Sequence, residues 1–345
     1  MRRTSLGLIG IVLLTTAALG NQAAVRVSPG RLETLTSVSS LAPAVVGLFR
    51  EPAGFEQVAA GHYLVFDRRG HAVYRVEAGG NAATRLVQIG GEEGRVLEPS
   101  AFDAAPDGTF VVADAPNGRE RVQVFNARGD LFSTFRLPGR ANTRVAIGAL
   151  ALNGVGTLAY TGESVVMNQP ESGWLITEYG LAGTAVRTVG QLRPTGHEAD
   201  RELHLALNAG IPVPEPGGGF YLVFLAGPPA FRKYDAKGTL IYERALQGRE
   251  IDPVVMSLPQ RWPRRTVGTT EVPLVTPIVR TAALDARGRL WVSFLPPVTY
   301  VYDPDGEKIR TVQLRGAGIL SPASLSFAPS GRLLVAPGCY EFGPE

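Results

Sequence analysis

The feature of this sequence that most limits its fold is a short apolar segment that recurs after a glycine. The copies are GHYLVF, GTFVVA, GTLAYT, GFYLVF, GRLWVS and GRLLVA, which begin at Gly61, Gly108, Gly156, Gly219, Gly288 and Gly331. Three central positions are apolar in every copy, and many are β-branched or aromatic, which indicates buried strands rather than helical turns. Successive copies begin 47, 48, 63, 69 and 43 residues apart. This period is typical of the four-stranded blades of a β-propeller, with two insertions.

A second marker follows most of these repeats, where a large apolar residue precedes a turn that ends in glycine. The copies are Phe125-NARG, Tyr179-GLAG, Tyr234-DAKG and Tyr302-DPDG, with Val76-EAGG as a degenerate copy. In each copy a glycine lies four positions after the apolar residue, where a tight hairpin needs a positive φ angle. The marker therefore indicates a third strand and a hairpin turn into a fourth.

One stretch, Ala101 to Leu137, contains a complete four-strand unit. Its sequence predicts a short first strand followed by strands at 109–113, 121–125 and 130–137. These lengths suit half-buried strands in a sheet. We therefore predict that residues 21–345 form a single all-β domain, a six-bladed β-propeller of four-stranded antiparallel blades.

The last blade, from about Ser321, has sequence for three strands only, whereas an extra extended segment at 25–38 precedes the first blade. A ring of sheets closes well when one blade takes strands from both ends of the chain. We expect an N-terminal strand to close the last blade, with the segment from Arg31 to Val38 beside Cys339 to Phe342.

Two of the glycine intervals are long, and they place insertions at about 191–207 and 248–279. We also expect a long loop at 161–173 in the third blade, after an inner strand at 149–152. In a propeller, the connections between blades share one face with the turns between second and third strands. We therefore expect all three segments on one face, where long loops on a rigid scaffold are often functional.

Residues 1–20 have the pattern of a signal peptide. Arg2 and Arg3 precede an apolar run from Leu6 to Leu14, and Ala18-Leu19-Gly20 supplies small residues for cleavage. An uncleaved membrane anchor is the alternative, but the run is shorter than the roughly 20 residues that a bilayer core requires. We expect a periplasmic or secreted protein without membrane contact after cleavage.

Charge and cysteine usage exclude further classes. Without residues 1–20, 32 Lys and Arg are balanced by 31 Asp and Glu, a net charge of +1. This balance gives no support to nucleic-acid binding. Cys339 is the only cysteine, so no intramolecular disulfide is possible. We expect its thiol to be a small apolar packing group in the third strand of the last blade; the alternative is an exposed thiol that pairs with another chain. We expect a monomer whose stability comes from its core.

The markers resemble those of the NHL-type six-bladed β-propellers, and the resemblance covers the chain from about residue 55. In that family the second strand often ends in Val-Ala-Asp, as Val112-Ala113-Asp114 does here. Asp67 has the equivalent place in the first blade, whereas the other blades have Gly162, Leu225, Phe294 and Pro337. The resemblance implies the propeller fold, and the departures mean that it implies no aspartate site repeated in every blade.

The first insertion brings histidines and a carboxylate together in sequence. His197, Asp200, Arg201 and His204 fall on one face if this segment is helical. Two histidines and a carboxylate can bind zinc, but Arg201 stands where a zinc-binding helix motif has its second histidine. A solvated amphipathic turn explains the same residues. We predict no metal and no cofactor, and keep His197, Asp200 and His204 as candidate binding residues.

The second insertion contains Arg261, Trp262, Arg264 and Arg265, where guanidinium groups flank an indole. Such a cluster suits carboxylate, sulfate or aromatic ligands through forked hydrogen bonds and cation–π contact. Alternatively, Trp262 covers the edge of a blade and the arginines are solvated. We consider these four residues a candidate site for a protein or a small polar or anionic ligand, because Trp and Arg are enriched at interfaces.

No catalytic motif is recognisable, because the sequence lacks GxSxG, a P-loop and HExxH. The inner-strand segments are mostly apolar or small, with Asp103 and Asp285 as exceptions, and we expect Asp285 in the turn after its inner strand. Calcium-dependent propeller lactonases, by contrast, need converging carboxylates. The histidines do not occupy equivalent blade positions, as a histidine-bound metal in a propeller lyase would need. We therefore predict no catalytic residues and a binding or scaffold module; the alternative is a metal-dependent lyase or hydrolase of the propeller type.

Overall fold

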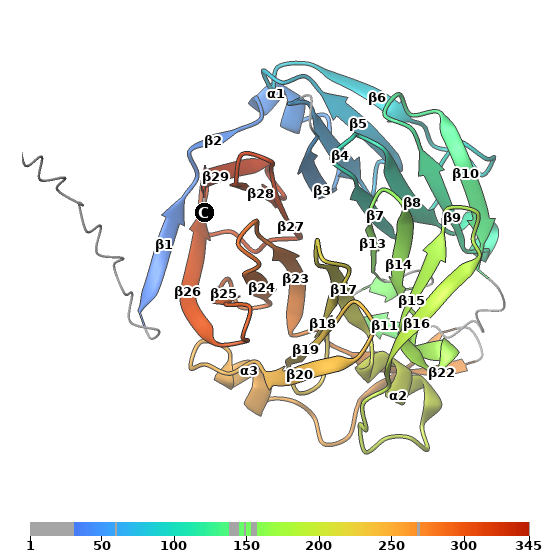
Figure 1. Cartoon of the computed structure of the whole chain (residues 1–345), viewed down its shortest axis with the longest axis vertical. Helices are drawn as coiled ribbons and strands as arrows, with labels where there is room; N and C mark the ends of the chain where they lie inside the picture. Colours follow the sequence, from blue (N-terminus) through green and yellow to red (C-terminus); the bar gives the residue numbers. More distant parts are fainter. Residues whose placement is uncertain are drawn as a thin grey trace, which may run out of the picture.

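The computed structural model describes residues 31–58, 61–137, 145–147, 150–152, 157–267 and 270–344. These residues form seven sheets, six of which are arranged in a ring around a common axis, as predicted (Figure 1). The proposed signal peptide lies outside the described residues.

Each blade is a meander whose strands are hydrogen-bonded in chain order, from the axis outward. Blade one contains β3 (Pro52–Gln57), β4 (Tyr63–Asp67), β5 (Ala72–Val76) and β6 (Ala83–Val87). Blade two contains β7 (Ala101–Ala104), β8 (Phe110–Asp114), β9 (Arg121–Phe125) and β10 (Leu131–Arg136). Blade three contains β13 (Leu158–Tyr160), β14 (Ser164–Asn168), β15 (Trp174–Gly180) and β16 (Ala185–Gln191).

Blade four contains β17 (Gly210–Pro214), β18 (Phe220–Phe224), β19 (Ala230–Tyr234) and β20 (Leu240–Ala245). Blade five contains β23 (Val279–Leu284), β24 (Leu290–Phe294), β25 (Thr299–Tyr302) and β26 (Lys308–Arg315). Blade six begins with β27 (Ser324–Phe327), β28 (Arg332–Ala336) and β29 (Tyr340–Pro344).

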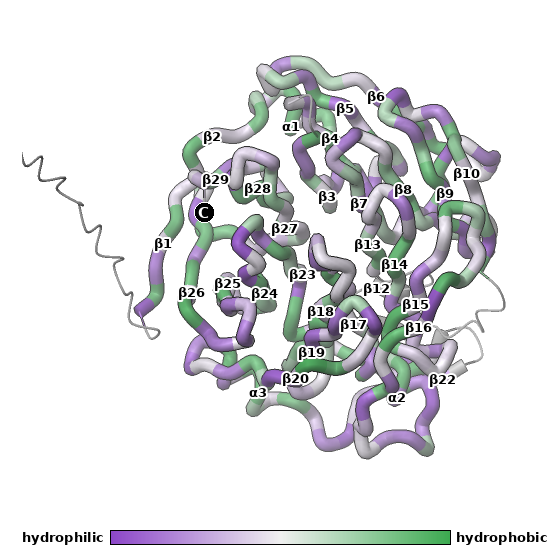
Figure 2. The backbone as a smooth tube through the Cα atoms, viewed as in Figure 1, coloured by the Kyte–Doolittle hydropathy of each residue, from purple (hydrophilic) through white to green (hydrophobic). Residues whose placement is uncertain are grey.

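The second strands form the most buried part of the ring. Every side chain of β4, β8, β14, β18 and β24 is buried, because these strands pack against neighbouring blades on both faces. The blade strands are mostly hydrophobic, and many connecting turns are hydrophilic (Figure 2). Aromatic rings pack across four blade boundaries: Phe66–Phe102, Phe135–Tyr179, Phe231–Tyr302 and Trp291–Phe327. The core is therefore continuous from blade to blade.

The N-terminal segment closes the ring in a slightly different way from the prediction. The short strand β2 (Ser39–Ser40) pairs antiparallel with β29, and the Val38 amide donates to Glu341 O at 2.8 Å. Earlier residues instead form β1 (Leu32–Thr36), which pairs in parallel with β26 as a fifth strand of blade five. Closure by the N-terminus is thus confirmed, but residues 32–36 cover the long open edge of β26.

Side chains reinforce this closure. The Tyr63 hydroxyl, in blade one, donates to Glu341 of β29, and Arg332 contacts the same carboxylate at 2.6 Å. Cys339 lies fully buried in a cluster that joins the first and last blades, and burial raises the pKa of its thiol to about 12. The thiol is therefore a packing group, as expected, although it precedes β29 instead of lying within it.

The register of the third blade differs from the prediction. The segment Leu158–Tyr160 is the inner strand β13, and the second strand is β14. The predicted loop at 161–173 therefore contains a strand, and the predicted inner strand at 149–152 overlaps β12 (Leu150–Leu152) of a separate sheet. The five-residue strand SVVMN occupies the buried second position, and the three-residue strand LAY lies at the axis.

Side chains also link inner strands of adjacent blades, whose axial edges have no further strand. Glu56 accepts a hydrogen bond from the Ala104 amide at 3.0 Å, and Asp103 accepts one from the Tyr160 amide. Burial, followed by the neighbouring Asp103 carboxylate, raises the pKa of Glu56. Burial also raises the pKa of Asp103 to about 6. These two carboxyls connect blades one, two and three at the axis.

Both predicted insertions lie outside the blades. The first contains α2 (Arg201–Leu207), and the second contains α3 (Asp252–Met256), β21 (Arg264–Val267) and β22 (Thr270–Val275). A further hairpin, β11 (Val145–Ile147) and β12, joins them in a sheet of order β12-β11-β22-β21. All these segments connect the outer strand of one blade to the inner strand of the next, so they share one face, here called the insertion face. None of the helices in the described ranges is long and apolar enough to span a membrane.

The closure predicts that a chain beginning at Leu41 is destabilised by several kcal/mol relative to a chain beginning at Arg31, because removal of β1 and β2 exposes two sheet edges. Thermal unfolding of both chains measures the difference. Equal melting temperatures would show that the ring does not depend on these strands.

The axial carboxyls predict a specific pH dependence. The pKa values of both carboxyls are higher in the folded protein than in the unfolded chain. Their contribution to the free energy of unfolding is therefore complete below about pH 4 and is lost as pH rises through about pH 6 and higher. In Glu56→Gln, the loss of unfolding free energy between about pH 5 and pH 8 should shrink by on the order of 1 kcal/mol. Denaturant unfolding measures this, with Glu93→Gln, an exposed side chain, as control. An unchanged slope in Glu56→Gln contradicts the assignment.

Candidate functional site

The two insertions form a structure on the insertion face that is here called the platform; it comprises α2, β21, β22 and the residues Arg261 and Trp262 before β21. Its first element is helix α2. Asp200 caps its N-terminus, since its Oδ1 accepts a hydrogen bond from the Leu203 amide at 3.3 Å. The buried side of the helix packs with the turn of blade four and with β22; its cluster comprises Leu203, Ala206, Leu207, Ala226 and Val275. The helix is therefore held between blade four and the sheet that contains β22.

A buried arginine fixes the other end of this helix. Arg193 donates through Nη2 to Leu207 O at 2.9 Å and to Ala226 O at 2.7 Å, and through Nη1 to Pro228 O at 2.9 Å. Its guanidinium lies 3.9 Å from the centre of the Phe224 ring. Burial lowers its pKa to about 10. Because Arg193 satisfies the carbonyl end of α2 and holds it to blade four, it gives the platform a fixed position.

The predicted histidines make local contacts. His204 Nδ1 lies 2.8 Å from Thr195 Oγ1 and 3.9 Å from Glu198 Oε1. The His197 amide donates to the same threonine hydroxyl at 3.2 Å. Across the described ranges, no group of three or more His, Cys, Asp or Glu side chains lies close enough to hold a metal ion. These contacts order the loop before α2.

The structure brings together residues from the two insertions. Arg264 of β21 forms an ion pair with Asp200, and its Nη1 donates to Glu271 O at 3.3 Å. Trp262 is half-buried and packs against the cluster beneath α2. Arg261 is exposed, and Arg265 is half-buried with its Nε lacking a hydrogen-bond partner. The two candidate clusters of the sequence are therefore one platform, in which Trp262 is partly a packing residue.

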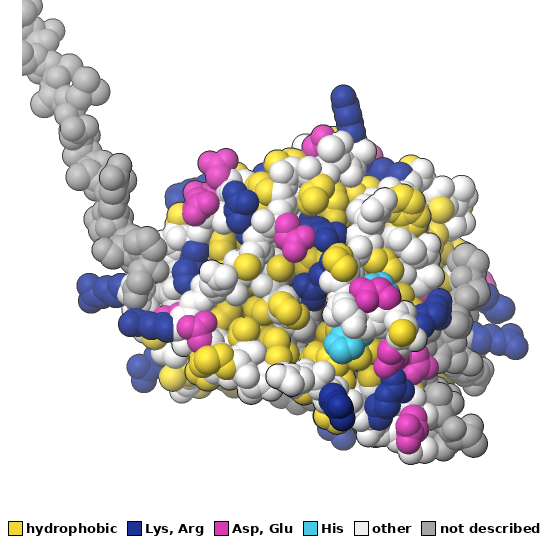
Figure 3. Space-filling view, turned by 90° about the horizontal axis from the view of Figure 1, so that it is seen from below, with side chains coloured by type: hydrophobic (Ala, Val, Ile, Leu, Met, Phe, Trp, Pro, Cys, Tyr) yellow, Lys and Arg dark blue, Asp and Glu magenta, His cyan; other side chains and the backbone are white. Residues whose placement is uncertain are grey.

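The platform and α3 lie at the rim of the ring (Figure 1). Figure 3 shows this side of the molecule, where hydrophobic side chains gather in the middle and charged side chains of both signs surround them. Met256 of α3, in the second insertion, is 79% exposed. A surface with exposed apolar side chains among charged ones is typical of protein contact sites.

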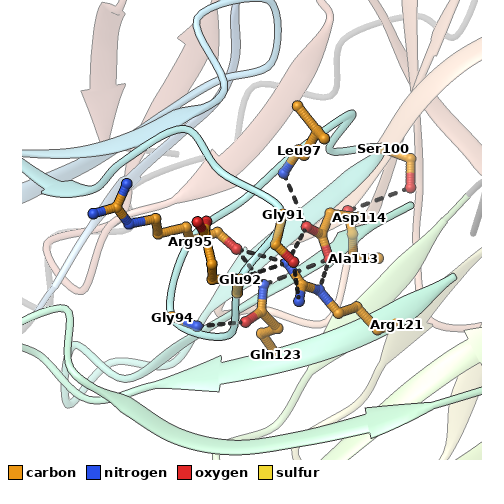
Figure 4. A network of polar contacts seen from close by, with 10 residues as sticks. All are labelled: Gly91, Glu92, Gly94, Arg95, Leu97, Ser100, Ala113, Asp114, Arg121 and Gln123. Atoms are coloured by element: carbon orange, nitrogen blue, oxygen red, sulfur yellow. Dashed lines mark hydrogen bonds and ion pairs between the residues drawn. The ribbon is translucent and has the colours of Figure 1, made fainter. Parts of the chain in front are cut away.

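The aspartates of the NHL-like motif have structural roles. Asp114 accepts hydrogen bonds from Arg121 Nε at 2.7 Å and from the Leu97 amide at 2.9 Å, and Arg121 also binds carbonyls of the loop before blade two (Figure 4). Asp67 accepts amides of Arg50 and Glu51 in the corresponding place. These carboxylates are occupied by the chain itself and hold the blade connections.

Two other carboxylates, Asp103 and Asp285, stood out in the sequence of the inner-strand segments. Asp285 belongs to the turn after β23, as predicted, where it accepts from the Arg287 amide at 2.9 Å and from Trp291 Nε1 at 3.0 Å. Asp103 does face the axial channel, with Glu56 beside it. The sequence reading missed Glu56, although a glutamate in an apolar inner strand could have indicated a group directed at the axis.

Comparison with known proteins supports the architecture. No family model matches the chain, and no curated protein sequence matches it. Among solved structures, a streptogramin B lyase aligns with a TM-score of 0.50 and 10% identity, covering 84% of this chain and 76% of that one. A gluconolactonase from Xanthomonas campestris aligns with a TM-score of 0.51 and 13% identity, covering 92% of this chain and 99% of that one. Identities this low show the fold alone, and that fold is a six-bladed β-propeller.

Proposed function

We propose that this chain is an exported, NHL-like β-propeller that acts as a binding or scaffold module through its insertion face. The observation that carries the proposal is the joining of two insertions, far apart in sequence, into one platform by the Asp200–Arg264 ion pair and the packing of Trp262 on α2. Buried contacts hold these surface segments in one conformation before a partner binds, and such preorganisation lowers the entropic cost of binding.

The chemistry of the platform favours a protein partner or a small polar or anionic ligand. Arg261 is exposed and Arg265 is half-buried, so their guanidinium groups can supply donors for carboxylates at the surface. Met256 of α3, in the same insertion as Arg261, is exposed and adds apolar area that a protein partner would cover.

The export part of the proposal rests on residues 1–20, with their basic start, apolar run and small residues at 18–20. The NHL-like part rests on the Val112-Ala113-Asp114 motif and its counterpart at Asp67. We expect the mature protein to act as a monomer. The alternative, a metal-dependent lyase or hydrolase, is supported only by similarity of fold, and a shared fold does not imply a shared activity.

The proposal predicts that the double variant Arg261→Gln/Arg265→Gln retains less partner from an envelope extract than wild type. The loss should be on the order of 1–2 kcal/mol in a later titration with the identified partner, and should shrink as salt rises. Trp262→Ala should weaken binding by more than about 1 kcal/mol if the indole also contacts the partner. Affinity capture followed by titration measures both effects.

The matched control is Arg128→Gln/Lys237→Gln, which removes two exposed cations in hairpin turns on the opposite face. Melting temperatures within a few degrees of wild type show that each variant is folded. If the control loses the partner while the platform variants retain it, binding occurs on the other face and the proposal is wrong.

A further inference from the structure

The six inner strands enclose an axial channel with a volume of about 470 Å³. Its lining includes side chains from every blade and extends along the lengths of β23 and β27. A cavity of this size is sufficient for a small organic molecule. The channel lies on the axis, whereas the platform lies at the rim, so the two are separate parts of the molecule.

The end of the channel at the insertion face carries an arginine in an unusual position. In β23, Val279 pairs with Phe294 and Thr281 with Ser293, so Arg280 lies at a β-bulge without an opposite residue. Val279 and Thr281 are buried, whereas Arg280 is exposed and lines the channel. Bulges redirect side chains and are frequent beside binding sites.

The Arg280 guanidinium is held in place but not neutralised. Its Nε donates to Pro322 O at 3.1 Å, across the boundary between blades five and six. Within the described ranges Arg280 has no ion pair, neither of its Nη groups makes a hydrogen bond, and the residue lines the channel. Arg68, which also lines the channel, is instead paired with Glu51.

A hydroxyl group lies on the neighbouring strand. Ser324 begins β27, which packs beside β23, and it lines the same cavity. Its Oγ is buried and has no hydrogen-bond partner. A buried polar atom without a partner is destabilising, and a ligand that supplies the missing bond removes this penalty.

The rest of the channel lining is compatible with an anionic ligand that also has an apolar part. Phe102, Leu284 and Phe327 contribute hydrophobic surface to the lining. The acidic groups, Glu56 and Asp103, hold protons to higher pH than free carboxyls because burial raises both pKa values, which lessens their repulsion of an anion.

We propose that the channel binds the carboxylate of a small organic acid at its insertion-face end, through Arg280 and Ser324, with the apolar body directed along the channel. A guanidinium presents two parallel N–H groups that match the geometry of a carboxylate, and a hydroxyl can donate to the same oxygens. This site is independent of the rim platform and would exist whether or not the platform binds a partner.

Calorimetric titration with hexanoate tests the proposal, with hexanamide as the neutral probe of the same shape. Wild type should bind hexanoate at least about tenfold more tightly than hexanamide, because only the carboxylate forms an ion pair with the guanidinium and can accept two parallel hydrogen bonds from it. Arg280→Gln should weaken hexanoate binding by about tenfold or more, and Ser324→Ala by a smaller factor, with hexanamide binding unchanged in Arg280→Gln. Arg287→Gln, which removes an exposed guanidinium at the opposite end of β23, should bind hexanoate as wild type does.

Three results would overturn the proposal: no hexanoate binding by wild type, equal binding of hexanoate and hexanamide, or wild-type affinity in a folded Arg280→Gln protein. If Arg280→Gln does not fold, Arg280→Lys retains the charge but not the forked donors. That variant should still weaken hexanoate binding, and unchanged affinity in it would also exclude the site. The comparison of the two probes on wild type needs no variant at all.

Discussion

The closed ring is the constraint on which the rest of this structure depends. Each blade is stable only between two neighbours, because its second strand buries side chains on both faces. The first and last blades must therefore meet, and β2 joins them by pairing with β29 while Tyr63 and Arg332 both contact Glu341. An open ring would expose sheet edges and apolar faces to water together.

The same constraint explains why function is expected in the segments between blades. A closed ring fixes the ends of every connection, so an insertion can grow without disturbing the sheets. In this chain the insertions have become ordered structure, since Arg193 holds the end of α2 and the Asp200–Arg264 ion pair joins α2 to β21. The axial channel is the other consequence of closure, and Glu56 and Asp103 bridge the inner strands that line it.

The sequence was sufficient to predict the fold because the repeat is local. A glycine followed by an apolar strand recurs six times, a turn glycine follows in most blades, and each can be recognised without knowledge of its neighbours. The third blade was the exception, since LAY and SVVMN are both apolar runs and only packing decides which takes the buried second place. The pairing of β1 with β26 could not be predicted from the sequence either, because the open edge that β1 covers belongs to a strand near the other end of the chain.

The candidate site was predictable only in part, for a related reason. The sequence identified both insertions and the residues Asp200, Trp262 and Arg264, but the contact between Asp200 and Arg264, 64 positions apart, is a tertiary property. It also could not assign a direction to Arg280, whose orientation depends on a bulge in β23. Side chains with a local partner, such as Asp285 in its turn, were the ones placed correctly.

Native-state hydrogen exchange tests the central claim, that the N-terminal segment is part of one cooperative ring. The Val38 and Leu41 amides donate to Glu341 O and Cys339 O, so they should exchange only with global unfolding and show the same opening free energy as amides of β8. Fast exchange at Val38 and Leu41, with β8 still fully protected, would show that the segment opens locally and that the ring stays closed without it.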